Sequence, residues 1–193
     1  MKILLDNGHG IDTPGKRSPM WPDGSQLFEF EFNRDIVKRV AADLRSAGVE
    51  VVIIVPEEID ISLKERVRRV NRIAGKEPCL LVSVHANAGG GTGWETFTSR
   101  GETKSDAYAT KIFNVAEVLL SGWKMRKDTC SDGDVDKEAD FTLLKATICP
   151  AVLTENLFMD TERDCRFLMS ESGRKVIADI HTFGILECLK WQS

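Results

Sequence analysis

The chain has 193 residues, of which 42% are hydrophobic and 29% charged, and this composition is that of an ordinary globular protein with one buried core. The formal net charge is -4 and the basic residues are spread along the chain, which argues against nucleic acid as the main partner. No stretch reaches the roughly 18 apolar residues of a membrane span, and the apolar start at residues 1–5 is too short for a signal-peptide core. We therefore expect one domain over residues 1–193, made in the cytoplasm and without a membrane span.

The five cysteines are an odd number and include no pair with C-x-x-C spacing. They therefore predict neither a disulfide framework nor a zinc ion bound by cysteines. Folding in a reducing compartment is the simpler interpretation.

Two apolar runs each end in a histidine. The first, at residues 3–5, leads into the motif DNGHG, in which glycines let the chain turn tightly around His9. The second, at residues 79–84, leads into His85 and a glycine-rich segment. Because open α/β sheets bind ligands at one edge of their strands, we expect the two imidazoles to lie at the same edge.

Two loops are expected beside these strand ends. Residues 11–26 are rich in Gly, Pro, Asp and Ser, and the large apolar side chains of Met20 and Trp21 either pack on the core or face a substrate. Residues 89–91 are three glycines without the lysine of a phosphate-binding loop. They predict a mobile loop beside the site.

Helical spacing runs from Glu29 to a stop at residues 46–48, so Glu29 and Glu31 lie in the first turn. A carboxylate in this turn also compensates the helix dipole, which is the structural explanation for either one. The sequence SLKE at residues 62–65 is a capping box and predicts a second helix over residues 63–74.

The alternation of strands and helices predicts the fold class. Residues 51–55 are β-branched and apolar throughout, as in a sheet covered on both faces. The other expected elements are strands at residues 80–84, 93–99, 141–144 and 151–154, the last of which leads into Glu155, and helices at residues 107–120 and 173–189. This order predicts an α/β fold in which helices flank a twisted, mostly parallel sheet.

Residues 124–140 are strongly polar. They contain five closely spaced acids, namely Asp132, Asp134, Asp136, Glu138 and Asp140. Alternating acids can bind calcium, but the ligand spacing and the terminal glutamate of an EF-hand are missing. A solvated loop is therefore favoured over a calcium site.

The histidines suggest a metal site. Two neutral imidazoles and one carboxylate, with an open fourth position, are what a hydrolytic zinc ion requires. His9 and His85 are the obvious nitrogen ligands, and the alternative is chance placement of two of the three histidines at strand ends. The third, His181, is expected to be an ordinary helix histidine.

Several motifs occur together in a specific order. They are DNGHG at residues 6–10, Glu29 with Asn33, SLKER at residues 62–66 with Asn71, SVHAN at residues 83–87, GWETF at residues 93–97 and PAVLTENLF at residues 150–158. Each motif alone is weak. The ordered set resembles the zinc-dependent N-acetylmuramoyl-L-alanine amidases of the Amidase_3 family.

This resemblance implies one bound Zn²⁺ with His9, Glu29 and His85 as its ligands. In that family the ligands are the first histidine, the glutamate that opens the first helix and the histidine before Ala-Asn. The family's glutamate lies four residues before an asparagine, which here is Asn33, so the resemblance selects Glu29 over Glu31.

The resemblance also implies a phosphorylase/hydrolase-like fold and a catalytic role for Glu155. A strand-end carboxylate with a structural hydrogen bond is the alternative for this residue. One departure from the family pattern occurs at residues 155–158, which read Glu-Asn-Leu-Phe instead of the commoner Glu, hydrophobic residue, Gly, Phe. Substrate contacts at this motif and in residues 124–140 are left open.

The implied reaction is hydrolysis of the amide bond between the lactyl group of N-acetylmuramic acid and L-alanine of the stem peptide in peptidoglycan. We expect a compact, endolysin-like enzyme of phage or mobile-element origin, which reaches the cell wall after release or export by another route. The alternatives are a catalytically inactive cell-wall-binding module and a zinc amidohydrolase or carboxypeptidase acting on another small amide. The sequence makes no prediction of the oligomeric state.

Overall fold

The computed structural model describes residues 1–130 and 133–191. In chain order the elements are β1 (Lys2–Asn7), α1 (Glu29–Ser46), β2 (Val51–Ile53), α2 (Leu63–Ala74), β3 (Cys79–Asn87), β4 (Glu95–Thr98), α3 (Lys104–Leu119), β5 (Lys137–Glu138), α4 (Thr142–Ala146), β6 (Ala151–Phe158), α5 (Glu162–Met169) and α6 (Glu171–Lys190). None of the described helices is long and apolar enough to cross a membrane.

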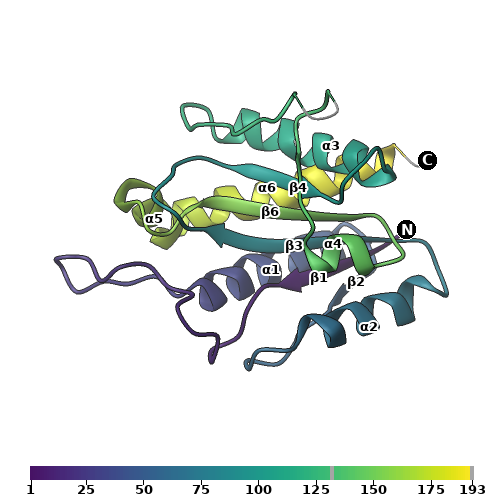
Figure 1. Cartoon of the computed structure of the whole chain (residues 1–193), viewed down its shortest axis with the longest axis horizontal. Coiled ribbons are helices and arrows are strands. Elements are labelled where there is room, and N and C mark those ends of the chain that lie inside the picture. Colours follow the sequence, from purple (N-terminus) through teal and green to yellow (C-terminus); the bar gives the residue numbers. More distant parts are fainter. Residues whose placement is uncertain (131–132, 192–193) are drawn as a thin grey trace.

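These strands form one sheet in the order β2-β1-β3-β6-β4-β5. Strands β2, β1, β3 and β6 are parallel, β4 is antiparallel to β6, and β5 is parallel to β4. Helices α1, α3 and α6 cover one face of the sheet, and α2 and α4 cover part of the other (Figure 1). The predicted α/β fold with a mostly parallel sheet flanked by helices is confirmed.

The central strands alternate between two hydrophobic cores. Leu5 and Val82 belong to the core under α1, α3 and α6, whereas Leu4 and Leu81 belong to the smaller core under α2 and α4. All four side chains are fully buried, and each contributes roughly 1.5–3 kcal/mol of hydrophobic stabilisation. Alternate residues of a strand share a face. Further along β3, the residues on the same face as Leu81 are polar. The uncovered end of this face is where the candidate site lies.

The strand predicted at residues 51–55 is shorter than expected, although its side chains pack against the hydrophobic cores on both faces of the sheet. β2 ends at Ile53, and its three side chains are only half-buried. β2 is an edge strand that pairs with β1 alone, so one side of it has no neighbouring strand. The apolar run predicted a strand correctly, but its place in the sheet depends on pairing that is not visible locally.

The strand predicted at residues 141–144 is wrong. This segment forms the short helix α4, in which the adjacent Leu143 and Leu144 are both buried against α2 and β6. A short apolar run does not distinguish a strand from a buried turn of helix. Helix α5, which buries Cys165 and Leu168, was not predicted from the sequence.

The capping box at the start of α2 is only half formed. Ser62 Oγ accepts a hydrogen bond from the Glu65 backbone N–H at 3.3 Å. The Glu65 carboxylate, however, pairs with Arg68 and Arg69 instead of reaching back to Ser62. The helix bounds were nevertheless predicted correctly.

Residues 124–140 are not simply a solvated loop. β5 joins the edge of the sheet beside β4, and Asp136, just before it, is fully buried. Burial, together with Asp134 and Asp106 nearby, raises the pKa of Asp136 to about 8. Asp132, one of the five acids of this segment, lies outside the described residues. All five cysteines are free, as the sequence indicated.

Candidate metal centre

The turn after β1 places the imidazole of His9 at the carboxyl end of the parallel strands. His9 has a positive φ of 64°, a left-handed conformation that costs an ordinary residue roughly 1–2 kcal/mol. Helix α1 holds this turn in place. The Asn33 amide donates to the Gly8 carbonyl at 3.1 Å, and Arg34 Nη1 donates to the His9 carbonyl at 2.9 Å.

Glu29, the first residue of α1, lies between the two histidines. Its Oε1 is 3.4 Å from His9 Nε2 and 3.2 Å from His85 Nδ1. The two imidazole rings lie edge to face, with centroids 5.0 Å apart. One ligand atom from each of the three residues lies within 4.8 Å of the others. Three segments far apart in the sequence therefore bring two nitrogen ligands and one oxygen ligand to one point.

Gly8 packs directly against the ring of His85. A Cβ atom added at Gly8 would lie 2.0 Å from His85 Cε1. A residue with a side chain at this position would therefore displace the imidazole or the turn. The close approach explains why a glycine precedes His9.

The charges of these groups support one another. Burial opposes ionisation of Glu29, but the hydrogen bonds and positive charges of His85 and His9 hold its pKa well below the usual range. Burial likewise opposes the charged form of His85, but Glu29, together with the charges of Glu155 and Asp6, raises its pKa. Glu29 and His85 thus each favour the charged form of the other, because opposite charges attract.

A chain of hydrogen bonds behind His85 fixes the orientation of its ring. His85 Nε2 lies 3.1 Å from Ser83 Oγ, and Ser83 Oγ donates to Asp6 Oδ2 at 2.6 Å. Asp6 Oδ1 in turn accepts from Arg66 Nη1 at 2.6 Å, in a pair that is almost fully buried. Since Nε2 is engaged with Ser83, Nδ1 is the nitrogen that faces Glu29 and is free to bind a metal.

Glu155 lies in β6 directly beside His85 in β3. Its Oε2 is buried and has no hydrogen-bond partner among the described residues. Burial raises the pKa of Glu155 to about 7, and the charges of Glu29 and Glu95 add to this increase while His85 opposes it. A carboxylate with a pKa near neutrality is suited to accept and release a proton.

The donor set fits a metal ion. Glu29 Oε2 is also buried without a hydrogen-bond partner in the described chain, and only Lys16 approaches it, at 3.8 Å. An orphaned carboxylate oxygen inside the protein is costly unless a cation satisfies it. Two imidazole nitrogens and one carboxylate oxygen are ligands that zinc accepts in hydrolytic sites. His9, Glu29 and His85 could therefore hold such an ion.

The structure brings together all four residues predicted for the site and leaves others outside it. Glu31, the alternative to Glu29, is exposed. His181 is fully buried in α6, with its ring within 2.7 Å of the Ile177 carbonyl and 2.8 Å of Thr154 Oγ1, and burial lowers its pKa to about 4. Met20 is exposed, whereas Trp21 packs against the core and donates to Cys165 Sγ.

Two groups of residues near the site were not predicted. Asp6 and Ser83 lie within the recognised motifs, and their spacing before the two histidines is a signal that could have indicated their role. Arg126 and Lys137 both reach the buried Glu95 in β4. They come from the polar segment after α3, where the sequence offers no periodicity or motif that marks them.

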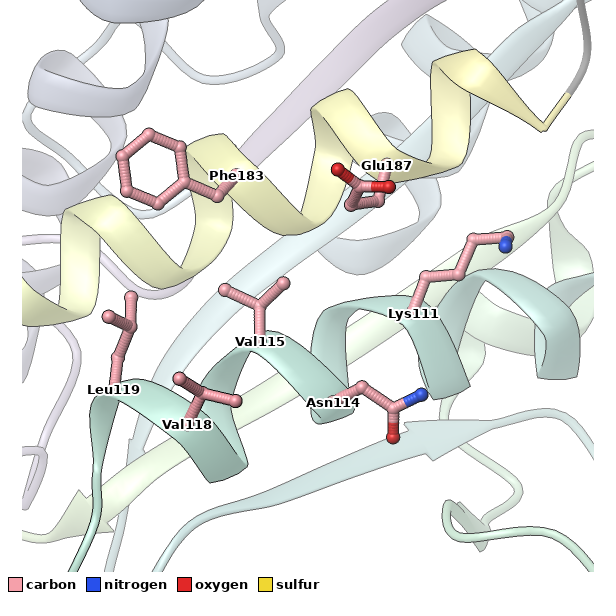
Figure 2. A pocket seen from close by; sticks show the side chains of 7 residues that line it. All are labelled: Lys111, Asn114, Val115, Val118, Leu119, Phe183 and Glu187. Atoms are coloured by element: carbon pink, nitrogen blue, oxygen red, sulfur yellow. The ribbon is translucent and has the colours of Figure 1, made fainter.

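Other hollows and clusters differ from the metal centre in chemistry. A pocket of about 290 Å³ adjoins His9 and His85 and is also lined by Thr13, Asp60 and Arg66. A groove of about 450 Å³ lies between α3 and α6, on the opposite side of the sheet. Figure 2 shows the side chains that line it, which are mostly apolar but include Glu187 and Lys111. A second group of acids, Asp106, Asp134 and Asp136, contains no imidazole.

A mostly parallel α/β sheet with two imidazoles, a buried carboxylate and a neighbouring carboxyl group of raised pKa is typical of metal-dependent hydrolases. The family model for N-acetylmuramoyl-L-alanine amidase, Amidase_3, matches residues 3–187. The chain belongs to this family, which confirms the resemblance seen in its motifs.

Individual relatives agree with the family assignment. The chain is 34% identical over 190 residues to an endolysin of Bacillus phage SPP1, a match that covers 97% of this chain and 65% of the endolysin. It is 27% identical over 190 residues to the N-acetylmuramoyl-L-alanine amidase CwlM of Bacillus licheniformis, covering 96% of this chain and 67% of that protein. The chain thus spans about two thirds of the length of these curated relatives.

Solved structures agree in fold. An N-acetylmuramoyl-L-alanine amidase from Clostridium difficile 630 superposes with a TM-score of 0.83 and 25% identity, covering 100% of this chain and 98% of that one. The catalytic domain of CwlV, an N-acetylmuramoyl-L-alanine amidase from Bacillus (Paenibacillus) polymyxa var. colistinus, gives a TM-score of 0.79 and 25% identity over 98% and 99% of the two chains.

Proposed function

We propose that this chain is a zinc-dependent N-acetylmuramoyl-L-alanine amidase, in which residues 1–193 act as one catalytic domain. It hydrolyses the amide bond between the lactyl group of N-acetylmuramic acid and L-alanine of the stem peptide. His9, Glu29 and His85 are the proposed ligands of one zinc ion, and Glu155 is the proposed general base. The observation that carries this proposal is the buried, unpartnered carboxylate oxygen of Glu155 beside a convergent His, Glu, His set.

The roles of the residues follow from their positions. A zinc ion bound there supplies a Lewis acid that polarises the amide carbonyl and lowers the pKa of water. Glu155 accepts a proton from the attacking water and delivers it to the amide nitrogen as the C–N bond breaks. Ser83 and Asp6 keep the His85 ring in the tautomer that presents Nδ1 to the site.

Family membership supports peptidoglycan as the substrate. The SPP1 relative is named an endolysin, and two relatives from Bacillus licheniformis and Bacillus subtilis are named N-acetylmuramoyl-L-alanine amidases. We propose that this chain likewise acts on the cell wall and reaches it after release or export by another route.

Metal analysis of the purified protein, combined with mass spectrometry of digested peptidoglycan, tests the proposal. The expected result is one zinc per chain and release of stem peptides that begin with free L-alanine. Chelation should abolish the release, and zinc should restore it. Glu155→Gln should bind zinc but release no peptide, whereas Glu31→Gln, in the same helix turn as Glu29 but exposed, should behave as wild type.

Different cleavage products would reject the proposal. Free reducing sugars, or peptides cut between two amino acids, would indicate another hydrolase. Binding to cell walls without any release would indicate a wall-binding module. Full activity of Glu155→Gln would show that Glu155 is not the general base. The identity of the cleaved bond would still be decided by the products.

A further inference from the structure

We propose that Arg126 and Lys137, held by the buried Glu95, form a binding subsite for a carboxylate of the stem peptide. This inference rests on the proposed amidase function and adds a substrate preference to it. It also gives a role to residues 124–140, which contain both cations. The amide-bond chemistry itself does not require these residues.

The subsite lies next to the proposed base. Glu95 in β4 is paired with Glu155 in the antiparallel register between β4 and β6, and Glu155 is paired with His85 in β3. Directly paired residues point to the same face of a sheet. His85, Glu155 and Glu95 therefore form a row across three neighbouring strands, with the proposed metal ligand at one end and Glu95 at the other.

Glu95 holds two cations at once. Its side chain is only 3% exposed, and its Oε1 accepts from Asn87 Nδ2 at 2.5 Å. Its Oε2 accepts from Arg126 Nε at 2.9 Å and from Lys137 Nζ. One cation would be enough to neutralise a buried carboxylate. The second cation gives the group of Glu95, Arg126 and Lys137 a net positive charge beside the site.

Arg126 keeps part of its guanidinium free for a ligand. Its Nε is bound to Glu95, but Nη1 and Nη2 have no protein partner in the described chain. The guanidinium also lies 5.1 Å from the ring centroid of Phe158, a cation–π contact that restrains the side chain. The side chains of Arg126 and Lys137 are 27% and 25% exposed, so a solute can reach them. A fixed guanidinium with two free terminal nitrogens is suited to bind a carboxylate in a bidentate manner.

The spacing matches the second residue of the stem peptide. Neighbouring strands lie about 4.8 Å apart, so the position of Glu95 is about 10 Å from that of His85 and about 5 Å from that of Glu155. An extended peptide spans at most about 3.5 Å per residue. When the amide before L-alanine lies between His85 and Glu155, the α-carboxyl of the next residue falls within reach of Arg126 and Lys137.

The test uses two synthetic N-acetylmuramoyl tripeptides that differ only at the α-carboxyl of the second peptide residue, free in one and amidated in the other. Wild-type protein loaded with zinc should cleave the free acid with a kcat/KM roughly 10- to 100-fold higher, the effect of one charge-assisted hydrogen-bonded pair. Arg126→Gln should lower kcat/KM for the acid, mainly through KM, and leave the amide almost unchanged. Lys127→Gln, a neighbouring cation that pairs with Glu117 on the surface, is the matched control.

The outcomes separate this inference from the proposed function. Equal cleavage of both tripeptides by wild type, or an equal loss on both by Arg126→Gln, would overturn the subsite while leaving the amidase function intact. Cleavage of neither tripeptide would count against the amidase function. In that case calorimetry of the corresponding free peptides tests the subsite. Tighter binding of the acid than of the amide by wild type, with the difference lost in Arg126→Gln, would support the subsite. Equal binding of the acid and the amide would overturn it.

Discussion

The indole Nε1 of Trp94 donates a hydrogen bond to Asn156 Oδ1 at 2.7 Å inside the protein. Asn156 Nδ2 also donates to the His85 carbonyl at 2.8 Å. Both Trp94 and Asn156 are fully buried. Asn156 thus ties the segment before β4 to β3 at a proposed metal ligand, in a position where the family more commonly has a hydrophobic residue.

Replacing this asparagine should destabilise the protein although the new residue fits the family pattern. Asn156→Leu would leave the Trp94 N–H and the His85 carbonyl without this partner, at a cost of about 1–3 kcal/mol. Urea denaturation measures the change in the free energy of unfolding. Asn114→Leu, at an exposed position of α3, is the control and should change it little. An unchanged free energy of unfolding in Asn156→Leu would show that another group accepts the hydrogen bond of the Trp94 indole.

At Leu157 we expect a glycine variant to be more stable than an alanine variant, which is the reverse of the usual order. Its φ is 61° and its side chain is fully buried. Both Leu157→Ala and Leu157→Gly lose the buried side chain, but glycine relieves the left-handed backbone by roughly 1–2 kcal/mol. The glycine variant should therefore be the more stable of the two by about 1 kcal/mol. At Leu153, in regular strand, the alanine variant should be the more stable, and the same order at both positions would contradict the strain at Leu157.

Ser83→Ala should weaken metal binding without removing a ligand. The substitution removes the group that engages His85 Nε2 and leaves Asp6 Oδ2 without its donor. Loss of such a supporting hydrogen bond typically costs about 10- to 100-fold in metal affinity. Competition against a chelator measures the affinity, with Ser46→Ala, on the exposed side of α1, as the control. Equal affinities would show that the His85 ring is held by packing alone.

Glu155 should make the metal-free protein less stable as the pH rises. Its pKa is raised from 4.5 to about 7, so below pH 4.5 the carboxyl is protonated in both the folded and the unfolded chain. Between these values the unfolded chain loses the proton and the folded chain keeps it, so stability falls, by at most about 3 kcal/mol. Urea denaturation at pH 4 and pH 8 should show that Glu155→Gln is more stable than wild type only at pH 8. A constant difference at both values would contradict the raised pKa.

The sequence predicted those parts of the fold and site that depend on local pattern. The bounds of α2 and the start of α1 at Glu29 follow from helical spacing and capping, and the carboxyl ends of β1 and β3 mark His9 and His85. The choice of Glu29 over Glu31 needed the family pattern, because both lie in one helix turn. The structure separates them by burial.

The features that were missed depend on long-range contacts. Leu143 and Leu144 form a helix because α2 and β6 bury both of them, and no local period encodes this. Lys137 reaches Glu95 because β5 pairs with β4, and Arg126 reaches it because its backbone N–H donates to the Trp94 carbonyl just before β4. Polar composition alone therefore could not distinguish a solvated loop from a segment that returns to the site.

The strand order also sets when the sheet can be completed during synthesis. β6 is the last of the strands to be made, yet it lies between β3 and β4, which do not pair directly with each other. All three proposed ligands are present once His85 has been translated, but Glu155 follows roughly 70 residues later, several seconds at about 5–20 residues per second. A nascent chain therefore contains all three proposed ligands before the proposed base, and β3 and β4 join one sheet only after β6 has been made.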